Sequence, residues 1–409
     1  MYEQMQKARD VALDVLKPSQ SEIEHGMELH ANSIVFDAYG FAPRAAMDGD
    51  ALRAAIEAGA SDAELQDMRE DMGMTRYVSN PTERAEFEAA WEAAGVTCIF
   101  QNAGEEGQSQ KTMIKRLARF TYATDMMPEL MRKAVTPDDI VAAKQEGRRA
   151  LYFSCNGVPL SEEWVTVEEE LRYVRIFFHL GARMMHLTYN RRNMIGDGCA
   201  EPANAGLSDF GRSAIAEMNR VGVIVDCAHS GWQTSLEAAQ TSQKPMVASH
   251  SVCCAVNTHA RGKPDGVIRA ICDTGGYIGI CAIPAFLGGS GDINAFLDHI
   301  DYAVKTFGAD HVAIGTDVAH SSSASEAEQR KVPPCGPART PWRSFWPPND
   351  ALLDPQWRDA TKVLSLAWTN WPAFTIGLVQ RGHSDEDIQK IIGGNVMRVA
   401  RAALSGSCR

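Results

Sequence analysis

Two histidines and an aspartate carry the clearest chemical signal in the sequence. His229 lies near the end of the stretch VIVDCAHS and His250 lies in MVASHS, and 21 positions separate them, about one strand–helix step. Adjacent parallel strands would bring both imidazoles to the same rim of a sheet. Imidazole is the commonest metal ligand in proteins, so the pair predicts a metal or catalytic site. The alternative is that each ring is bonded to nearby backbone.

An acidic residue follows a third apolar run in the same way. Asp317 ends VAIGTD, directly after a short buried stretch. An aspartate at a rim shared with two histidines is a candidate general base, or an acid that orients a metal. The other interpretation is a helix N-cap.

The elements that must position these residues alternate between short apolar runs and amphipathic segments. We expect eight strands, at 34–38, 96–102, 149–154, 184–189, 222–230, 246–251, 277–283 and 312–317. Eight strands alternating with helices predict an α/β fold, a (β/α)8 TIM-type barrel. A doubly wound open sheet is the main rival, but no GxGxxG or GxxxxGK[ST] motif opens a helix after a strand.

The bulk composition limits the possible partners and compartment. The 409 residues are 45% hydrophobic, with a net charge of −12 and a pI near 5.4, which argues against nucleic acid. The N-terminal residues lack the apolar centre of a signal peptide, and no run approaches the roughly 18 apolar residues of a membrane helix. Ten cysteines form no CxxC pair, which favours a reduced, cytoplasmic protein.

Three regions depart from the alternation. We expect one barrel domain over 1–409, with a helical extension at 1–30 and a helical insertion at 41–80. Residues 320–356 are rich in Ser, Pro and Trp, and predict a long loop over the strand ends.

Several blocks together resemble the membrane (renal) dipeptidase family of zinc-dependent hydrolases, within the amidohydrolase-type barrels. The resemblance runs from about Ser33 to Ala403, and it is carried by LGARMMHLTYNRRNMIGDGCAEP, GLSDFG, GVIVDCAHS, SHS, RGKPD, GGYIGI, DHVAIGTD and RGHSDEDIQKIIGGNVMRV. It implies a distorted (β/α)8, metallo-dependent hydrolase-like barrel, usually a homodimer. Members typically bind two zinc ions and cleave dipeptides or related small amides.

The chain departs from the family at four positions. In IVFDAYGFAP, Tyr39 falls on the histidine and Phe41 on the aspartate that bind the first metal. Cys155, in SCNG, falls on the glutamate that bridges the two metals, and Tyr189, in LTYN, on a substrate-binding histidine. A phenyl ring cannot coordinate zinc, and a phenol that titrates near 10 is a weak ligand at neutral pH. We therefore expect the first metal position to be lost.

The remaining family positions are kept. The resemblance gives His229 and His250 as ligands of the second metal, Arg261 as the substrate-carboxylate arginine, and Asp317 as the catalytic aspartate. We expect one zinc ion held by Cys155, His229 and His250, a known catalytic shell of one thiolate and two imidazoles. Two alternatives stay open: no metal, with Cys155 as a packing residue, or two metals.

The sequence thus predicts a hydrolase of a small amide or amino-acid-like substrate that carries a carboxylate. Asp317, Tyr39 and Tyr189 are the candidate acid, base and hydrogen-bonding groups, and Arg261, Tyr189 and Phe41 the candidate substrate contacts. A lyase or isomerase that uses one zinc and a tyrosine is the second hypothesis. The third is a catalytically inactive small-molecule-binding homologue.

Overall fold

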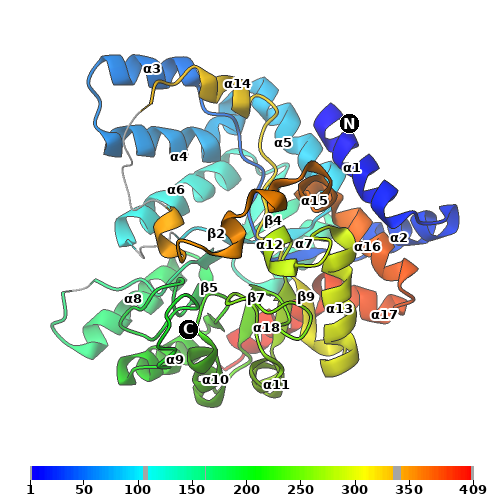
Figure 1. Ribbon diagram of the computed structural model, residues 1–409. Coiled ribbons are helices and arrows are strands. Elements are labelled where there is room, and N and C mark those ends of the chain that lie inside the picture. Colours follow the sequence, from blue (N-terminus) through cyan, green and yellow to red (C-terminus); the bar gives the residue numbers. More distant parts are fainter. Residues whose placement is uncertain (1, 105–108, 162, 335–341, 407–409) are drawn as a thin grey trace.

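Parallel strands form the centre of the molecule, seen in a computed structural model that describes residues 2–104, 109–161, 163–334 and 342–406 (Figure 1). Eight strands follow in the order β1-β2-β4-β5-β6-β7-β8-β9 and make a nearly closed barrel, and β3 pairs with β4. The strands are β1 Phe36–Gly40, β2 Cys98–Asn102, β3 Met131–Ala134, β4 Arg149–Cys155, β5 Ala182–His186, β6 Ile224–Asp226, β7 Val247–Ser251, β8 Tyr277–Ile280 and β9 Val312–Ile314.

The barrel closes where the segment after β9 meets β1. The backbone N–H of Asp317 donates to the carbonyl of Tyr39 at 3.0 Å. The backbone N–H and the hydroxyl of Thr316 donate to the two carboxylate oxygens of Asp37, at 2.9 and 2.6 Å. This return of the last strand to the first confirms the predicted barrel and excludes the doubly wound open sheet.

The strand sequences suit a sheet that is buried on both faces. Side chains that point into the barrel form one apolar cluster, and those that point outward pack under the helices. Because neither face meets water, the strands read as nearly continuous apolar runs. The pairing register of β1 on β2 shifts between Asp37 and Gly40, and Tyr39 in this shift belongs to the inner cluster.

All eight predicted strands overlap an observed strand, but strand β3 and the helix that follows it were not predicted. Strand β3 and helix α7 (Pro137–Gln145) lie between β2 and β4. The sequence of β3, MRKA, carries two charged residues, which are only partly buried, so it lacks the apolar run used to recognise the other strands.

Helices surround the strands. They are α1 Glu3–Leu16, α2 Gln20–Asn32, α3 Gly49–Glu57, α4 Asp62–Ser79, α5 Pro81–Ala94, α6 Gln110–Met126, α8 Val167–His179, α9 Asp209–Val221, α10 Trp232–Thr241, α11 Asp265–Asp273, α12 Pro284–Leu287, α13 Ile293–Phe307, α15 Ala360–Ser365, α16 Trp371–Gln380, α17 Asp385–Gln389 and α18 Asn395–Leu404. No helix among the described residues is long and apolar enough to cross a membrane.

The segment after β1 builds a helical layer at one side of the barrel. Figure 1 shows α3 and α4 in blue above α6, with the short helix α14 (Ser325–Arg330) beside α3. Asp48 caps α3 through the N–H of Ala51, and Ser61 forms a capping box with Glu64 at the start of α4. These caps start two separate helices in a region whose composition alone predicts only helix.

The region 320–356 follows β9 and is partly helical. It contains α14 and three short 3-10 turns, η2 Trp342–Phe345, η3 Ala351–Leu353 and η4 Pro355–Arg358. Residues 335–341 of the predicted loop lie outside the described residues. The aromatic side chains of η2 reach the strand ends, where the candidate site lies.

Candidate functional site

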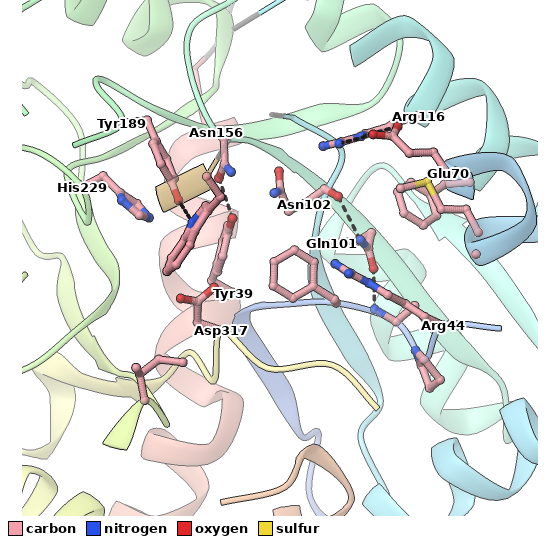
Figure 2. Close-up of a pocket in the computed structure, with 18 of the residues that line it drawn as sticks. Tyr39, Arg44, Glu70, Gln101, Asn102, Arg116, Asn156, Tyr189, His229 and Asp317 are labelled. Atoms are coloured by element: carbon pink, nitrogen blue, oxygen red, sulfur yellow. Dashed lines mark hydrogen bonds and ion pairs between the residues drawn. The ribbon is translucent and has the colours of Figure 1, made fainter. Parts of the chain in front are cut away.

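A cavity of about 520 Å³ opens at the carboxyl ends of the strands. Its wall joins the barrel rim to α4 and to the turn η2, and Figure 2 shows the two ends of this wall. The residues from the barrel rim that line it include Tyr39, Gln101, Asn102, Asn156, Tyr189, His229, Arg261 and Asp317. Active sites of this barrel type lie at this face.

The two predicted histidines meet at this rim. Nε2 of His229 lies 3.0 Å from Nε2 of His250, and both side chains are buried. The Nδ1 atom of His229 bonds to Oδ1 of Asn190 at 2.8 Å, and Nδ1 of His250 bonds to Oγ of Ser249 at 2.8 Å. Each ring is thus held from behind, with its Nε2 atom directed at the other ring.

The hydrogen-bond partners fix the tautomers of this pair. The side-chain oxygen of Asn190 can only accept, so Nδ1 of His229 carries the proton. Ser249 donates its hydroxyl to Asp226, so it accepts from Nδ1–H of His250. Burial, and then the charge of Arg261, hold the pKa of both histidines well below the usual value, so both rings are neutral. Two lone pairs therefore face each other at 3.0 Å.

This donor set fits a divalent cation. Two lone pairs in such proximity repel unless a cation lies between them, and 3.0 Å is less than twice the ~2 Å bond of zinc to imidazole. Hydrogen bonds to the remote ring nitrogens are the usual support of metal-binding histidines. His229 and His250 are therefore the residues of this site that suit a metal.

Tyr39 and Tyr189 cover these two rings. The Tyr39 ring stacks on His250 with centroids 3.8 Å apart, and the Tyr189 ring stacks on His229 at 4.1 Å. The Tyr39 hydroxyl donates to Oδ1 of Asn156 at 2.5 Å, and the indole of Trp342 donates to the Tyr189 hydroxyl at 2.9 Å. Each tyrosine thus holds one face of an imidazole.

Phe41 lies one step further from the histidines. Its ring meets the Tyr39 ring edge-on at 5.8 Å, and the guanidinium of Arg44 lies 4.9 Å above its centre. Phe41 offers no donor atom, so it forms part of an apolar wall of the cavity.

Asn156, and not the predicted Cys155, lines the cavity at the end of β4. Cys155 ends β4 and is fully buried, outside the cavity wall, and burial raises the pKa of its thiol to about 12. Asn156 lines the cavity and bonds to Tyr39. The structure does not bring Cys155 into a convergent ligand group with His229 and His250. The side chain that faces the site is that of the next residue.

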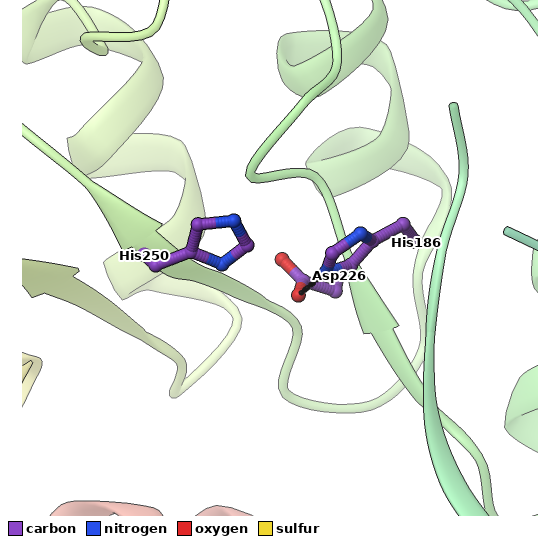
Figure 3. A group of neighbouring side chains, drawn as sticks. All are labelled: His186, Asp226 and His250. Carbon is purple, nitrogen blue, oxygen red and sulfur yellow. Dashed lines mark ion pairs between the residues drawn. The ribbon is translucent and has the colours of Figure 1, made fainter. Parts of the chain in front are cut away.

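A buried histidine that the sequence analysis did not single out lies close to the pair. His186, at the end of β5, has its Nε2 2.7 Å from a carboxylate oxygen of Asp226, and both are fully buried (Figure 3). His186, Asp226 and His250 form a group whose ligand atoms lie within 4.8 Å of one another. A histidine inside the apolar run MMHLTY was the available signal.

Asp226 links this histidine to the site. Burial acts to raise the pKa of Asp226, but the charge and hydrogen bond of His186 and the bonds from Ser249 outweigh it, so the pKa lies below its usual value. Asp226 also accepts from the backbone N–H of Ala228 and Ser249 at 2.9 and 3.0 Å. An aspartate that is already bonded this fully acts as an anchor for His250 through Ser249.

Arg261 and Asp317 complete the rim. Arg261 is fully buried and donates to the backbone carbonyls of Ala228 and of His250, the latter at 3.0 Å. Arg261 lines the cavity, and its buried Nε atom has no hydrogen-bond partner among the described residues. Asp317 lines the cavity with a backbone φ of 57°, a conformation that few non-glycine residues adopt.

Fold and site together define the class of this protein: it is a metallohydrolase-type (β/α)8 barrel with a neutral imidazole pair at the active rim. More particularly, the membrane dipeptidase family, peptidase family M19, matches residues 24–329, and the chain belongs to this family. The family assignment implies a metal cofactor, in agreement with the donor set of the two histidines.

Two named dipeptidases are similar to this chain at low sequence identity. Dipeptidase tcpJ of Claviceps purpurea (strain 20.1) is 26% identical over 282 residues, which cover 68% of this chain and 56% of tcpJ. Dipeptidase verJ of Clonostachys rogersoniana is 28% identical over 229 residues, 55% of this chain and 50% of verJ. The matches span about half the length of these curated relatives.

Among solved structures, an amidohydrolase from Pseudomonas aeruginosa is similar with a TM-score of 0.66 and 23% identity, over 92% of this chain and 98% of that one. A metallo peptidase from Rhodobacter sphaeroides, liganded with a phosphinate mimic of the dipeptide L-Ala-D-Ala, has a TM-score of 0.57 and 19% identity, over 91% and 100%. At these identities the likeness supports the fold.

Proposed function

We propose that this protein hydrolyses a small peptide-like amide, with one metal ion held at His229 and His250. The observation that carries the proposal is the 3.0 Å approach of the two Nε2 atoms, each with its Nδ1 proton engaged elsewhere. The names of tcpJ and verJ, and the dipeptide mimic bound by the Rhodobacter sphaeroides protein, support a peptide-like substrate.

A metal at this pair would polarise the amide carbonyl and lower the pKa of a water molecule. Asp317 is then the general base at the rim. The buried Nε–H of Arg261 serves as a donor to a substrate carboxylate. Tyr189, whose hydroxyl accepts from Trp342, is placed in the wall to donate its own proton to an oxygen of the substrate.

We propose zinc as this metal, in one copy. Phe41 has no donor atom, and the Tyr39 hydroxyl is bonded to Asn156, so the first metal position of the family lacks its ligands. We leave Cys155 out of the ligand set because no convergent group of ligand atoms among the described residues contains its thiol. The side-chain oxygen of Asn156, the residue that follows β4, takes its place as the candidate third ligand.

The test measures metal content and hydrolysis on the same sample. Protein purified without added metal is examined by elemental analysis, and a panel of dipeptides is assayed before and after chelation. We expect about one zinc per chain and hydrolysis that chelation abolishes. His229→Ala and His250→Ala should each lose the metal, whereas the surface change His25→Ala should not. Two metals per chain, or full activity after metal removal, would overturn the proposal.

We also propose a single barrel domain, a homodimer and a cytoplasmic location. All eight cysteines in the described part of the chain are free, as a reducing compartment favours. Light scattering after size-exclusion chromatography measures the subunit number, and a mass corresponding to one chain would contradict the dimer.

A further inference from the structure

The cavity continues well beyond the histidine pair, along one face of α4. The residues of α4 that line it are Gln66, Arg69, Glu70, Gly73, Met74 and Tyr77. Their spacing of three and four residues places them on a single face of the helix. The insertion after β1 therefore supplies the outer wall of the cavity, which Figure 2 shows at the end opposite His229.

The inner end of the cavity is aromatic. Tyr39 and Tyr189 cover the histidines, and Phe286 stacks on Trp346 with ring centroids 5.7 Å apart. Trp342 bonds to Tyr189 and meets Trp346 at 5.4 Å. This part suits the apolar portion of a ligand next to the scissile amide.

The outer end is polar and contains guanidinium groups. Arg44, which lies over Phe41, and Arg69 of α4 both line it. Arg116 is bonded to both carboxylate oxygens of Glu70, at 2.7 and 3.0 Å, and Arg119 also bonds to Glu70. The one carboxylate among the described residues of this outer wall, Glu70, is thus engaged by two arginines.

A bare dipeptide, held at the histidines and Arg261, would leave this outer end unused. Cavities of roughly 300 to 1,000 Å³ take ligands of drug size, and this cavity measures about 520 Å³. A longer substrate would fill both the aromatic and the basic end.

We propose that the substrate is an elongated acidic peptide-like amide, whose second carboxylate binds at Arg44 and Arg69 while its scissile amide lies at the histidine pair. This rests on the proposed function for the peptide-like nature of the substrate and for the position of its scissile amide. Guanidinium groups form strong, directional hydrogen bonds with carboxylates, and Arg44 and Arg69 enter the wall from two different segments.

Gly73 offers a way to block the outer end without disturbing the fold. It lies in the middle of α4 in the cavity wall, and an added Cβ would meet no atom within 4 Å. A larger side chain at this position therefore extends into open space. Gly73→Phe should fill the outer end, and Gly73→Ala serves as its matched control.

The experiment compares peptides that differ only in one charge. Glu-Ala-Ala is paired with Gln-Ala-Ala, and Ala-Ala-Glu with Ala-Ala-Gln, and binding is measured by calorimetry on the metal-loaded full chain alongside hydrolysis. A phosphoseryl-Ala-Ala arm distinguishes a phosphate preference from a carboxylate preference. The variants are Arg44→Gln/Arg69→Gln, Gly73→Phe and Gly73→Ala, with Arg53→Gln as control, because Arg53 on α3 pairs with Asp50 at 2.6 Å outside the cavity wall.

In one of the two pairs, we expect the Glu peptide to bind about 10-fold or more tightly than its Gln partner. The Arg44→Gln/Arg69→Gln variant should reduce this ratio of affinities to near one. Gly73→Phe should weaken the tripeptide but not Ala-Ala, and Arg53→Gln and Gly73→Ala should match the parent protein. Equal binding of Glu and Gln peptides, a ratio that survives the double variant, or a preference for the phosphoseryl peptide would overturn the proposal. Charge-dependent binding without hydrolysis of any peptide would instead refute the proposed function and leave this site assigned.

Discussion

The phenol ring of Tyr39 lies nearly parallel to the imidazole of His250, with 3.8 Å between their centroids and 14° between their planes. Tyr39 thus supports one face of the His250 imidazole, the ring that we propose as a metal ligand. A flat ring on one side, and the Ser249 hydroxyl behind Nδ1, leave His250 a single orientation for its Nε2.

This relationship predicts that ring shape at position 39 matters more than the hydroxyl group. Tyr39→Phe keeps the stack and loses the bond to Asn156, so metal content should stay near that of the parent protein. Tyr39→Ala removes the stack and should lower metal affinity, measured by competition with a chelator, by about 10-fold or more. A loss of hydrolysis of about 100-fold or more in Tyr39→Phe would instead indicate proton transfer by the phenol.

The hydrogen bond behind His229 leads to a second prediction. Asn190→Ala removes the acceptor of Nδ1–H and should weaken metal binding by about 10- to 100-fold. Asn190→Asp keeps an acceptor and should retain the metal. Because Asn190 has a positive φ of 47°, the alanine variant should also melt earlier, so calorimetry must first show that both variants are folded at the assay temperature. Equal affinities in the two variants would contradict this role.

Substitution of Cys155 tests whether this residue is a metal ligand or a packing residue. Its side chain is fully buried in the outer apolar cluster, so Cys155→Ala should cost about 1 to 2 kcal/mol of unfolding free energy, measured with denaturant. Zinc content should not change. If Cys155→Ala loses its zinc while it stays folded, the thiol is a ligand after all and the assignment of Asn156 is wrong.

The ion pairs of Glu70 predict a pH dependence of stability. Burial alone would raise the pKa of Glu70, but Arg116 and Arg119 lower it to about 2. Because the folded-state pKa lies below the unfolded one, this contribution is present above the unfolded value of about 4.5 and is lost as the pH falls toward 2. It amounts to roughly 2 to 3 kcal/mol.

Glu70→Gln isolates this effect. The difference in unfolding free energy between the parent protein and this variant should shrink between about pH 5 and pH 2, and chemical denaturation across that range measures it. A difference that stays constant with pH would show that Glu70 does not stabilise the fold through its charge.

The barrel could be predicted because apolar runs and helix patterns alternate along most of the chain. The register of those runs also placed His229 and His250 at one rim, since His229 follows shortly after β6 and His250 lies near the end of β7. Strand β3 was not predicted because its charged, half-buried side chains interrupt the apolar pattern expected of a buried strand. The prediction that Cys155 faces the cavity depended on which of two successive residues points inward at the end of β4. Side chains alternate between the two faces of a strand, and here Asn156 points toward the cavity.

Other parts of the site depend on contacts between distant segments. Asn190 and Ser249 support the histidines from a loop and a strand, and no local pattern marks either as a hydrogen-bond partner. The approach of Trp342 to Tyr189 joins segments 153 residues apart. The role of α4 in the cavity wall likewise requires knowing how the insertion folds back over the rim.

The position of α4 has a consequence for how new specificities could arise in such a chain. The outer wall of the cavity is formed by α4, which lies outside the barrel sheet and supplies neither histidine of the pair. Substitutions along its inward face can therefore change which molecules are accepted while the catalytic apparatus stays intact. Grafting residues 41–80 onto another barrel of this family should therefore transfer the ligand preference and leave the barrel rim of the recipient unchanged.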